Sequence, residues 1–188
     1  MEFETSRLIV REFTLGDVVD IHRIATTDGF VFYNLDGSEQ ASQAFVERAI
    51  DKSKETSRDS FKMAVEDKDR PGRCIGYVSI DDIGSSTPNA PDVGYIIDPR
   101  EQGKGFATEA MVGLMQSTFH HHPEIDQVWL TVHPDNKASQ GVARKLTFKY
   151  VGDKELETKR GIEPRLVYQT DQERFNAQHR HVEVLMEM

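Results

Sequence analysis

A turn with two glycines at alternate positions constrains this sequence most. Residues 102–107 read Gln-Gly-Lys-Gly-Phe-Ala and separate a strand-like apolar run from a run with helical spacing. Glycine has no Cβ, so Gly103 and Gly105 allow a sharp turn and a close approach of the backbone to a ligand. The first N–H groups of the following helix lack partners within it, and its dipole attracts anions. The turn therefore predicts a seat for a phosphate or pyrophosphate, although such turns also serve as ordinary strand-to-helix connections.

Two common phosphate-binding motifs are absent around this turn. The chain has neither the P-loop pattern GxxxxGK[S/T] nor the dinucleotide pattern GxGxxG. The three adjacent histidines at 120–122 do not predict a metal site either, because neighbouring residues on a helix point about 100° apart and do not converge on one ion. We therefore expect no bound metal.

The spacing of apolar residues predicts a mixed α/β domain. After the turn, apolar residues recur at i, i+3, i+4, i+7 and i+8 from Ala107 and predict a helix that faces the core. Thr14, with Asp17 three residues later, predicts another helix start. Further helices are expected at 38–54 and 135–146, and strands at 5–13, 61–66, 73–83, 92–98, 127–133, 148–152 and 165–169. This order indicates helices layered on a central sheet, in one domain over 1–175 with a C-terminal tail at 176–188.

Composition narrows the class of protein. The 188 residues suffice for one domain with its own core, and 37% hydrophobic with 29% charged residues is typical of a soluble globular chain. A formal net charge of −9 argues against nucleic acid as a partner, and no apolar run approaches membrane-spanning length. The acidic start, Met1–Glu4, has no signal-peptide pattern, so we expect a cytoplasmic location. Cys74 stands alone and is expected to be a small core residue.

Three segments carry a family resemblance. Residues 98–110, Asp-Pro-Arg-Glu-Gln-Gly-Lys-Gly-Phe-Ala-Thr-Glu-Ala, resemble the acetyl-CoA-binding motif of the GNAT N-acetyltransferases, Q/R-x-x-G-x-G/A. The opening residues 5–11 and the segment 136–139, followed later by Phe148, resemble the branch of that family that acetylates the N-termini of ribosomal proteins. The resemblance covers about residues 5–170. It implies a central, mostly antiparallel twisted sheet with helices on both faces, and acetyl transfer from acetyl-CoA to a primary amine.

The resemblance also assigns roles on the side of the acetyl donor. The strand before the turn would pair with the pantetheine arm through its main chain, since that arm resembles a peptide. Asn136 would bond the pantetheine amides, and either Asn136 or Asp135 could also cap the helix that follows. Lys104 and Arg100 either add positive charge near the phosphates or are solvated turn residues. The cofactor-binding residues implied are Ile96, Ile97, Gln102, Gly103, Lys104, Gly105, Phe106, Ala107 and Asn136.

Ser139 matches the serine that this branch is thought to place beside the thioester sulfur. A hydroxyl donor there would stabilise or protonate the departing thiolate. Many relatives use a tyrosine four residues further on, but this chain has Ala143, which excludes that mechanism at this position. Thr147 also replaces the glycine that usually ends this helix, and it predicts local strain.

The acceptor side is less defined by the sequence. The acceptor is a small-molecule amine or a protein N-terminus, and a homodimer is left open. The aromatic residues Phe30, Phe32 and Tyr33 either line a substrate site or close the core. A non-catalytic acyl-CoA-binding or sensing domain is the main rival, and a nucleotide-binding regulator is a second one. The candidates for the general base are Asp81, Asp82, His133, Glu155 and Glu157.

Overall fold

The computed structural model describes residues 2–27, 35–85, 91–158, 161–179, 182 and 184–186. Phe30, Phe32 and Tyr33 lie outside these ranges. The helices are η1 (Leu15–Asp17), α1 (Val18–Ala25), α2 (Glu39–Ser53), η2 (Pro99–Glu101), α3 (Phe106–His121), α4 (Lys137–Lys145) and α5 (Gln172–His179). The strands are β1 (Phe3–Glu4), β2 (Leu8–Arg11), β3 (Phe61–Asp67), β4 (Cys74–Asp81), β5 (Asp92–Ile97), β6 (Gln127–Val132), β7 (Lys149–Thr158), β8 (Gly161–Asp171) and β9 (Leu185–Met186).

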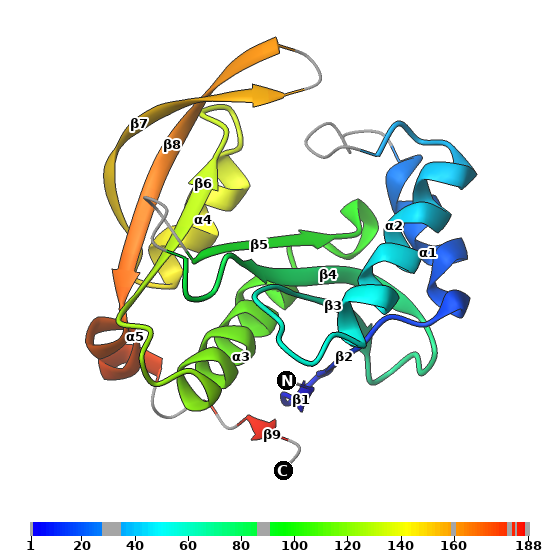
Figure 1. Cartoon of the computed structure of the whole chain (residues 1–188), viewed down its shortest axis with the longest axis horizontal. Helices are drawn as coiled ribbons and strands as arrows, with labels where there is room; N and C mark the ends of the chain where they lie inside the picture. The colour runs from blue at the N-terminus through cyan, green and yellow to red at the C-terminus, as the bar shows by residue number, and fades with distance from the viewer. Residues whose placement is uncertain are drawn as a thin grey trace.

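Within the described ranges, nine strands form one sheet in the order β7-β8-β6-β5-β4-β3-β2-β1-β9. Neighbouring strands are antiparallel except for β5 and β6, which are parallel. Their register has a single pair, Asp92 with Trp129, whereas β4 and β5 share six register pairs. Figure 1 shows β5 and β6 running in different directions from their meeting point. The expected mostly antiparallel sheet is therefore confirmed, and its one parallel contact opens into a gap.

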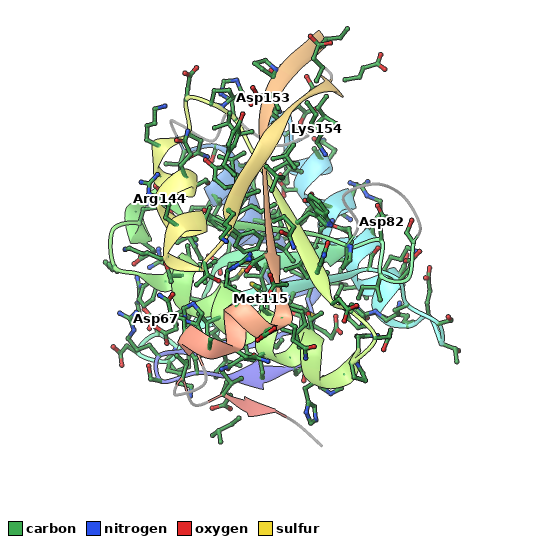
Figure 2. The ribbon with its side chains drawn as sticks, turned by 90° about the vertical axis from the view of Figure 1, so that its left-hand side faces the viewer. Asp67, Asp82, Met115, Arg144, Asp153 and Lys154 are labelled. Atoms are coloured by element: carbon green, nitrogen blue, oxygen red, sulfur yellow. The ribbon has the colours of Figure 1, made fainter. Side chains whose placement is uncertain are left out.

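Helices cover both faces of the sheet, as the resemblance implies. On β3, Met63 and Val65 belong to a core with α3, while Ala64 between them belongs to a second core with α1 and α2. Alternate strand residues face opposite sides, so these two cores lie on opposite faces. Figure 2 labels Met115, whose side chain is fully buried in the α3 core.

The predicted helices form with small shifts. Thr14 and Asp17 form the predicted capping box at η1. In α2 the buried residues are Ser42, Val46 and Ala49, at helical spacing, and Phe45 and Ile50 pack partly buried against the same core. Cys74 is fully buried, and burial raises the pKa of its thiol to about 12, which confirms it as an inert core residue.

The predicted strand over 5–13 is wrong in one respect, because the chain turns away between β1 and β2. Glu109 in the first turn of α3 accepts hydrogen bonds from the Thr5 hydroxyl (2.6 Å), the Ser6 hydroxyl (3.1 Å) and the Arg7 backbone N–H (3.0 Å). The strands β1 and β2 pair antiparallel as a hairpin, and the polar residues Thr5, Ser6 and Arg7 form its turn, in which the Thr5 N–H donates to the Leu8 carbonyl at 2.9 Å.

The C-terminal third also differs from expectation. β7 and β8 continue well past the predicted 148–152 and 165–169, as a hairpin whose outer part extends beyond the sheet (Figure 1). Helix α5 crosses the predicted boundary at residue 175, and β9 pairs with β1. No helix among the described residues is long and apolar enough to cross a membrane.

Thr147 ends α4 in the strained conformation that the missing glycine predicts. Its φ is +64°, in the left-handed region. The Phe148 N–H donates to the Ala143 carbonyl (3.0 Å) and the Thr147 N–H to the Arg144 carbonyl (3.2 Å), the bonding pattern of a Schellman motif. The Thr147 hydroxyl is bonded to the Thr170 hydroxyl at 3.1 Å. The helix thus ends as a glycine would end it, and α4 keeps its position.

Phe175 of α5 provides a test of whether residues beyond β8 belong to the folded domain. Its side chain is fully buried and lies 5.8 Å from Phe119 of α3 between ring centroids. We expect Phe175→Ala to lower the free energy of unfolding by about 3–5 kcal/mol, because it leaves a cavity in the α3 core. A chain ending after His179 should lose far less. Urea denaturation measures both, and a loss below about 1 kcal/mol for Phe175→Ala would place α5 outside the cooperative unit.

Candidate active site

The glycine turn adopts the geometry that its sequence predicts. Gly103 and Gly105 have φ values of +79° and +86°, which a side chain would strain. Gly105 is the N-cap residue of α3, and a Cβ added there would lie 3.5 Å from Nη2 of Arg7. The backbone therefore enters α3 with its first N–H groups free of intrahelical partners. This is the arrangement that binds anions at a helix start.

A cavity of about 370 Å³ lies against this turn and the start of α4. It contains nine of the ten residues predicted for the site, including Ser139. Lys104 is the exception: its Nζ donates to Glu101 at 2.7 Å. The lining residues to which the sequence reasoning gave no site role are Tyr95, Pro99, Glu101, Thr108, Ala138, Gly141, Val142 and Lys145. We call this the donor cavity.

Two buried carboxylates next to the turn, Asp98 and Glu101, are held by hydrogen bonds from basic side chains. Asp98 is fully buried and accepts hydrogen bonds from Arg100 and Arg23. Burial alone would raise its pKa, but these bonds hold the pKa of Asp98 below its ordinary value. The hydrogen bond from Arg70 lowers the pKa of Glu101 to about 2, although burial alone would raise it. The hydrogen bond from Lys104 contributes to the same lowering of this pKa. Arg100 and Lys104 thus serve as partners of these carboxylates.

One edge of β5 faces the donor cavity. The Asp98 N–H donates to the carbonyl of Ile75 in β4, so the backbone groups of Ile97 point to the opposite edge. Gln102 donates its side-chain amide to the Ile97 carbonyl at 3.0 Å, which joins the turn to the strand. The structure therefore gives Gln102 a bracing role. The expected pairing of Ile96 and Ile97 with a pantetheine arm stays a prediction.

Ser139 is held at the start of α4 by two partners. Asn136 is the N-cap residue, and its Oδ1 accepts the Ser139 backbone N–H at 2.9 Å, which confirms the capping interpretation. Tyr95 of β5 donates its hydroxyl to Ser139 Oγ at 2.9 Å. Tyr95 and Ser139 are 44 positions apart, and no local pattern could have paired them. The sequence reasoning missed Tyr95 for this reason.

A second cavity, of about 500 Å³, lies on the other side of this hydroxyl pair. Tyr95, Asn136 and Ser139 line both cavities, so the two meet at Ser139. The hairpin of β7 and β8, where Figure 2 shows Asp153 and Lys154, contributes one wall. The charged residues of the lining are Asp36, Lys62, Asp81, Asp92, Glu157, Glu163 and Arg165, five of them acidic. We call this the acceptor cavity.

The structure sorts the candidates for the general base. Asp81, His133 and Glu157 line the acceptor cavity, while Asp82 and Glu155 do not. Asp92 was missed: burial raises its pKa to about 7, and its Oδ1 is buried without a hydrogen-bond partner among the described residues. Burial also raises the pKa of Asp81. A carboxyl that titrates near neutral pH is suited to accept a proton from an amine.

The histidines at 120–122 make other contacts. His121 Nδ1 lies 2.8 Å from the Ser117 carbonyl, and His122 Nδ1 lies 3.2 Å from Glu124. Across the part of the chain that the structure describes, no group of three or more His, Cys, Asp or Glu side chains is placed to hold a metal ion.

A split sheet with two joined cavities on either side of a hydroxyl pair defines a group-transfer site. The family model of the acetyltransferase (GNAT) domain matches residues 7–149, more than half of the chain. The chain therefore belongs to the GNAT acetyltransferase family. It is 24% identical over 155 residues to the uncharacterized N-acetyltransferase YnaD of Bacillus subtilis (strain 168), covering 81% of this chain and 85% of that protein.

Solved structures share the fold. The ribosomal-protein-S5-alanine acetyltransferase from Vibrio fischeri aligns with a TM-score of 0.73 and 20% identity, over 91% of this chain and 96% of that one. The microcin C7 self-immunity acetyltransferase MccE, solved in complex with acetyl-CoA and AMP, aligns with a TM-score of 0.72 and 19% identity, over 88% and 93%. Both carry the same fold as this chain.

Gly105→Val should abolish the predicted anion-binding site at the turn. We expect the affinity for acetyl-CoA to fall by at least about tenfold, because a β-branched residue resists φ near +86° and displaces the first amides of α3. Isothermal titration calorimetry measures this. Gly84→Val is a matched control, since Gly84 has a φ of +76° but does not line the donor cavity. Equal affinity losses in the two variants would contradict the role of the turn.

Asp92→Asn should stabilise the protein at high pH and not at low pH. The folded pKa of about 7 lies above the ordinary 3.8, so stability falls as pH rises between these values and stays lowered above them. We expect Asp92→Asn to raise the free energy of unfolding by about 2–4 kcal/mol at pH 8, with little change near pH 4. Denaturant titrations at the two pH values measure the difference. Asp51→Asn, at an exposed position of α2, is the control. Equal gains in the free energy of unfolding of Asp92→Asn at both pH values would contradict the burial of the charge.

Proposed function

We propose that this chain transfers the acetyl group of acetyl-CoA to a primary amine by direct attack, without an acetyl-enzyme. The observation that carries this proposal is the position of Ser139, whose hydroxyl lies where the donor and acceptor cavities meet. A thioester in one cavity and an amine in the other would meet beside a hydroxyl donor. Such an arrangement lowers the barrier by orientation and by protonation of the leaving thiolate.

The donor cavity supports acetyl-CoA as the cosubstrate. Amides from Gly103 to Ala107 would bind the pyrophosphate, and the open edge of β5 at Ile96 and Ile97 would pair with the pantetheine amides. Asn136 caps α4 through Oδ1, which leaves its amide N–H groups as donors for the same arm. MccE, with the same fold, is in complex with acetyl-CoA.

The acceptor cavity supports an amine as the second substrate. Five of its seven charged lining residues are acidic, and Asp92 has the pKa of a base that works near neutral pH. Asp92, acting directly or through water, would remove the proton from the bound ammonium before the attack. The Vibrio fischeri neighbour is named for a ribosomal protein, and a chimera of spermidine N-acetyltransferase from Vibrio cholerae shares the fold with a TM-score of 0.70. Both a protein and a small-molecule amine are therefore supported as acceptors.

A panel of amines tests the proposal. Thiol release from acetyl-CoA is followed with peptides of different N-terminal residues, a polyamine and an amino sugar. At least one amine should stimulate release well above the hydrolytic background. Binding of acetyl-CoA with no release by any amine would instead favour the acyl-CoA-sensing rival, and stabilisation by ATP or NAD but not CoA would favour a nucleotide-binding regulator.

Ser139→Ala tests the assignment of the hydroxyl. We expect kcat to fall by about 10- to 100-fold, with the affinity for CoA nearly unchanged, because the hydroxyl acts on the departing sulfur. Ser53→Ala in α2 removes a hydroxyl remote from both cavities and should leave kcat unchanged. Wild-type turnover in the Ser139 variant would remove this residue from the mechanism.

A further inference from the structure

Tyr95 lies on the wall that separates the two cavities. It is the fourth residue of β5, and it lines both the donor and the acceptor cavity. Its hydroxyl donates to Ser139 Oγ at 2.9 Å. The two residues come from elements on opposite sides of the gap between β5 and β6. Their bond therefore crosses the opening through which the reactants would meet.

This hydrogen bond determines what the Ser139 hydroxyl can do. A serine hydroxyl has one hydrogen to donate and accepts through its lone pairs. Because Ser139 Oγ accepts from Tyr95, its own hydrogen is not directed at Tyr95 and can be donated into the donor cavity. The Ser139 backbone is fixed in turn by the bond from its N–H to Asn136 Oδ1.

We propose that Tyr95 is a positioning residue of the acetyl transfer, which orients the Ser139 hydroxyl toward the thioester sulfur and restores its proton. The inference rests on the proposed function and adds to it a second hydroxyl from the neighbouring strand. No other ring hydroxyl among the described residues is bonded to Ser139. His133, which also lines the acceptor cavity, accepts the Asp135 N–H through Nδ1 at 3.2 Å.

The protons and electrons balance in such a step. The amine nitrogen forms a bond to the acetyl carbon, the carbon–sulfur bond breaks, and its electron pair leaves on sulfur. The Ser139 proton passes to sulfur, and the Tyr95 proton passes to Ser139 Oγ. The acylated nitrogen loses one proton to water in the acceptor cavity, and water returns one to Tyr95. The products are the amide and the free thiol of CoA, with the enzyme restored.

A double-mutant cycle tests whether Tyr95 acts through Ser139. We expect Tyr95→Phe to lower kcat about tenfold while the KM for acetyl-CoA and the affinity for CoA stay within about twofold. In the Ser139→Ala background, the same change should lower kcat by less than about twofold, because the hydroxyl that it orients is gone. Equal losses in the two backgrounds, or wild-type kcat in Tyr95→Phe, would overturn the inference.

Controls separate this inference from the proposed function and from a folding defect. Tyr150→Phe removes the hydroxyl of an exposed tyrosine on β7 that is bonded to Asp153, and it should leave kcat unchanged. Tyr95→Phe removes one oxygen atom, and thermal unfolding shows whether this variant is folded. If its loss of kcat is matched by an equal loss of CoA binding, the inference is overturned. A wild-type enzyme that releases no thiol with any amine would refute the proposed function itself.

Discussion

The parting of β5 and β6 is the constraint on which the rest of this site depends. The two parallel strands meet at Asp92 and Trp129 and diverge beyond that pair, while β5 stays bonded to β4 along its whole length. Backbone groups on an open strand edge need partners. Gln102 satisfies the Ile97 carbonyl, and the remaining edge faces the donor cavity. The same divergence lets the acceptor cavity reach Ser139 from the other side. An extended ligand with amides, such as a pantetheine arm, would complete the interrupted sheet.

Rigidity around the opening comes from buried ion pairs and not from the glycines. Gly103 and Gly105 permit the turn but do little to hold it, because glycine loses the most conformational freedom when ordered. Asp98 is the N-cap residue of the short helix η2 and Glu101 is its last residue. Arginines from other parts of the chain bind them: Arg23 of α1 binds Asp98, and Arg70 after β3 binds Glu101. Loss of one arginine would leave a buried carboxylate with fewer partners for its charge, which destabilises the turn. The turn is thus fixed by distant parts of the chain.

Local sequence patterns predicted much of the fold and much of the donor cavity. The stripe from Ala107 predicted α3, Thr14 and Asp17 predicted η1, and the glycine turn predicted the left-handed backbone before α3. The family resemblance named nine of the residues that line the donor cavity. Features made by distant residues escaped prediction. The bonds that Glu109 accepts from the turn between β1 and β2 join positions more than 100 apart. Asp92 has a raised pKa because the fold buries it, and Tyr95 meets Ser139 only because β5 and α4 face each other. Neither burial nor pairing across elements is encoded in spacing.

Position 143 explains why a second hydroxyl would come from a strand. Ala143 stands where the family resemblance implies a tyrosine in many members; it is fully buried, does not line the donor cavity, and packs in the core with Leu146 and Phe148. A tyrosine at that place would overfill this core. Tyr95, from β5, reaches Ser139 across the gap without disturbing α4, whose end is already fixed by the strained Thr147. Because Tyr95 of β5 lines both cavities, its hydroxyl lies next to both substrates, a position that a residue on the buried face of α4 would not have.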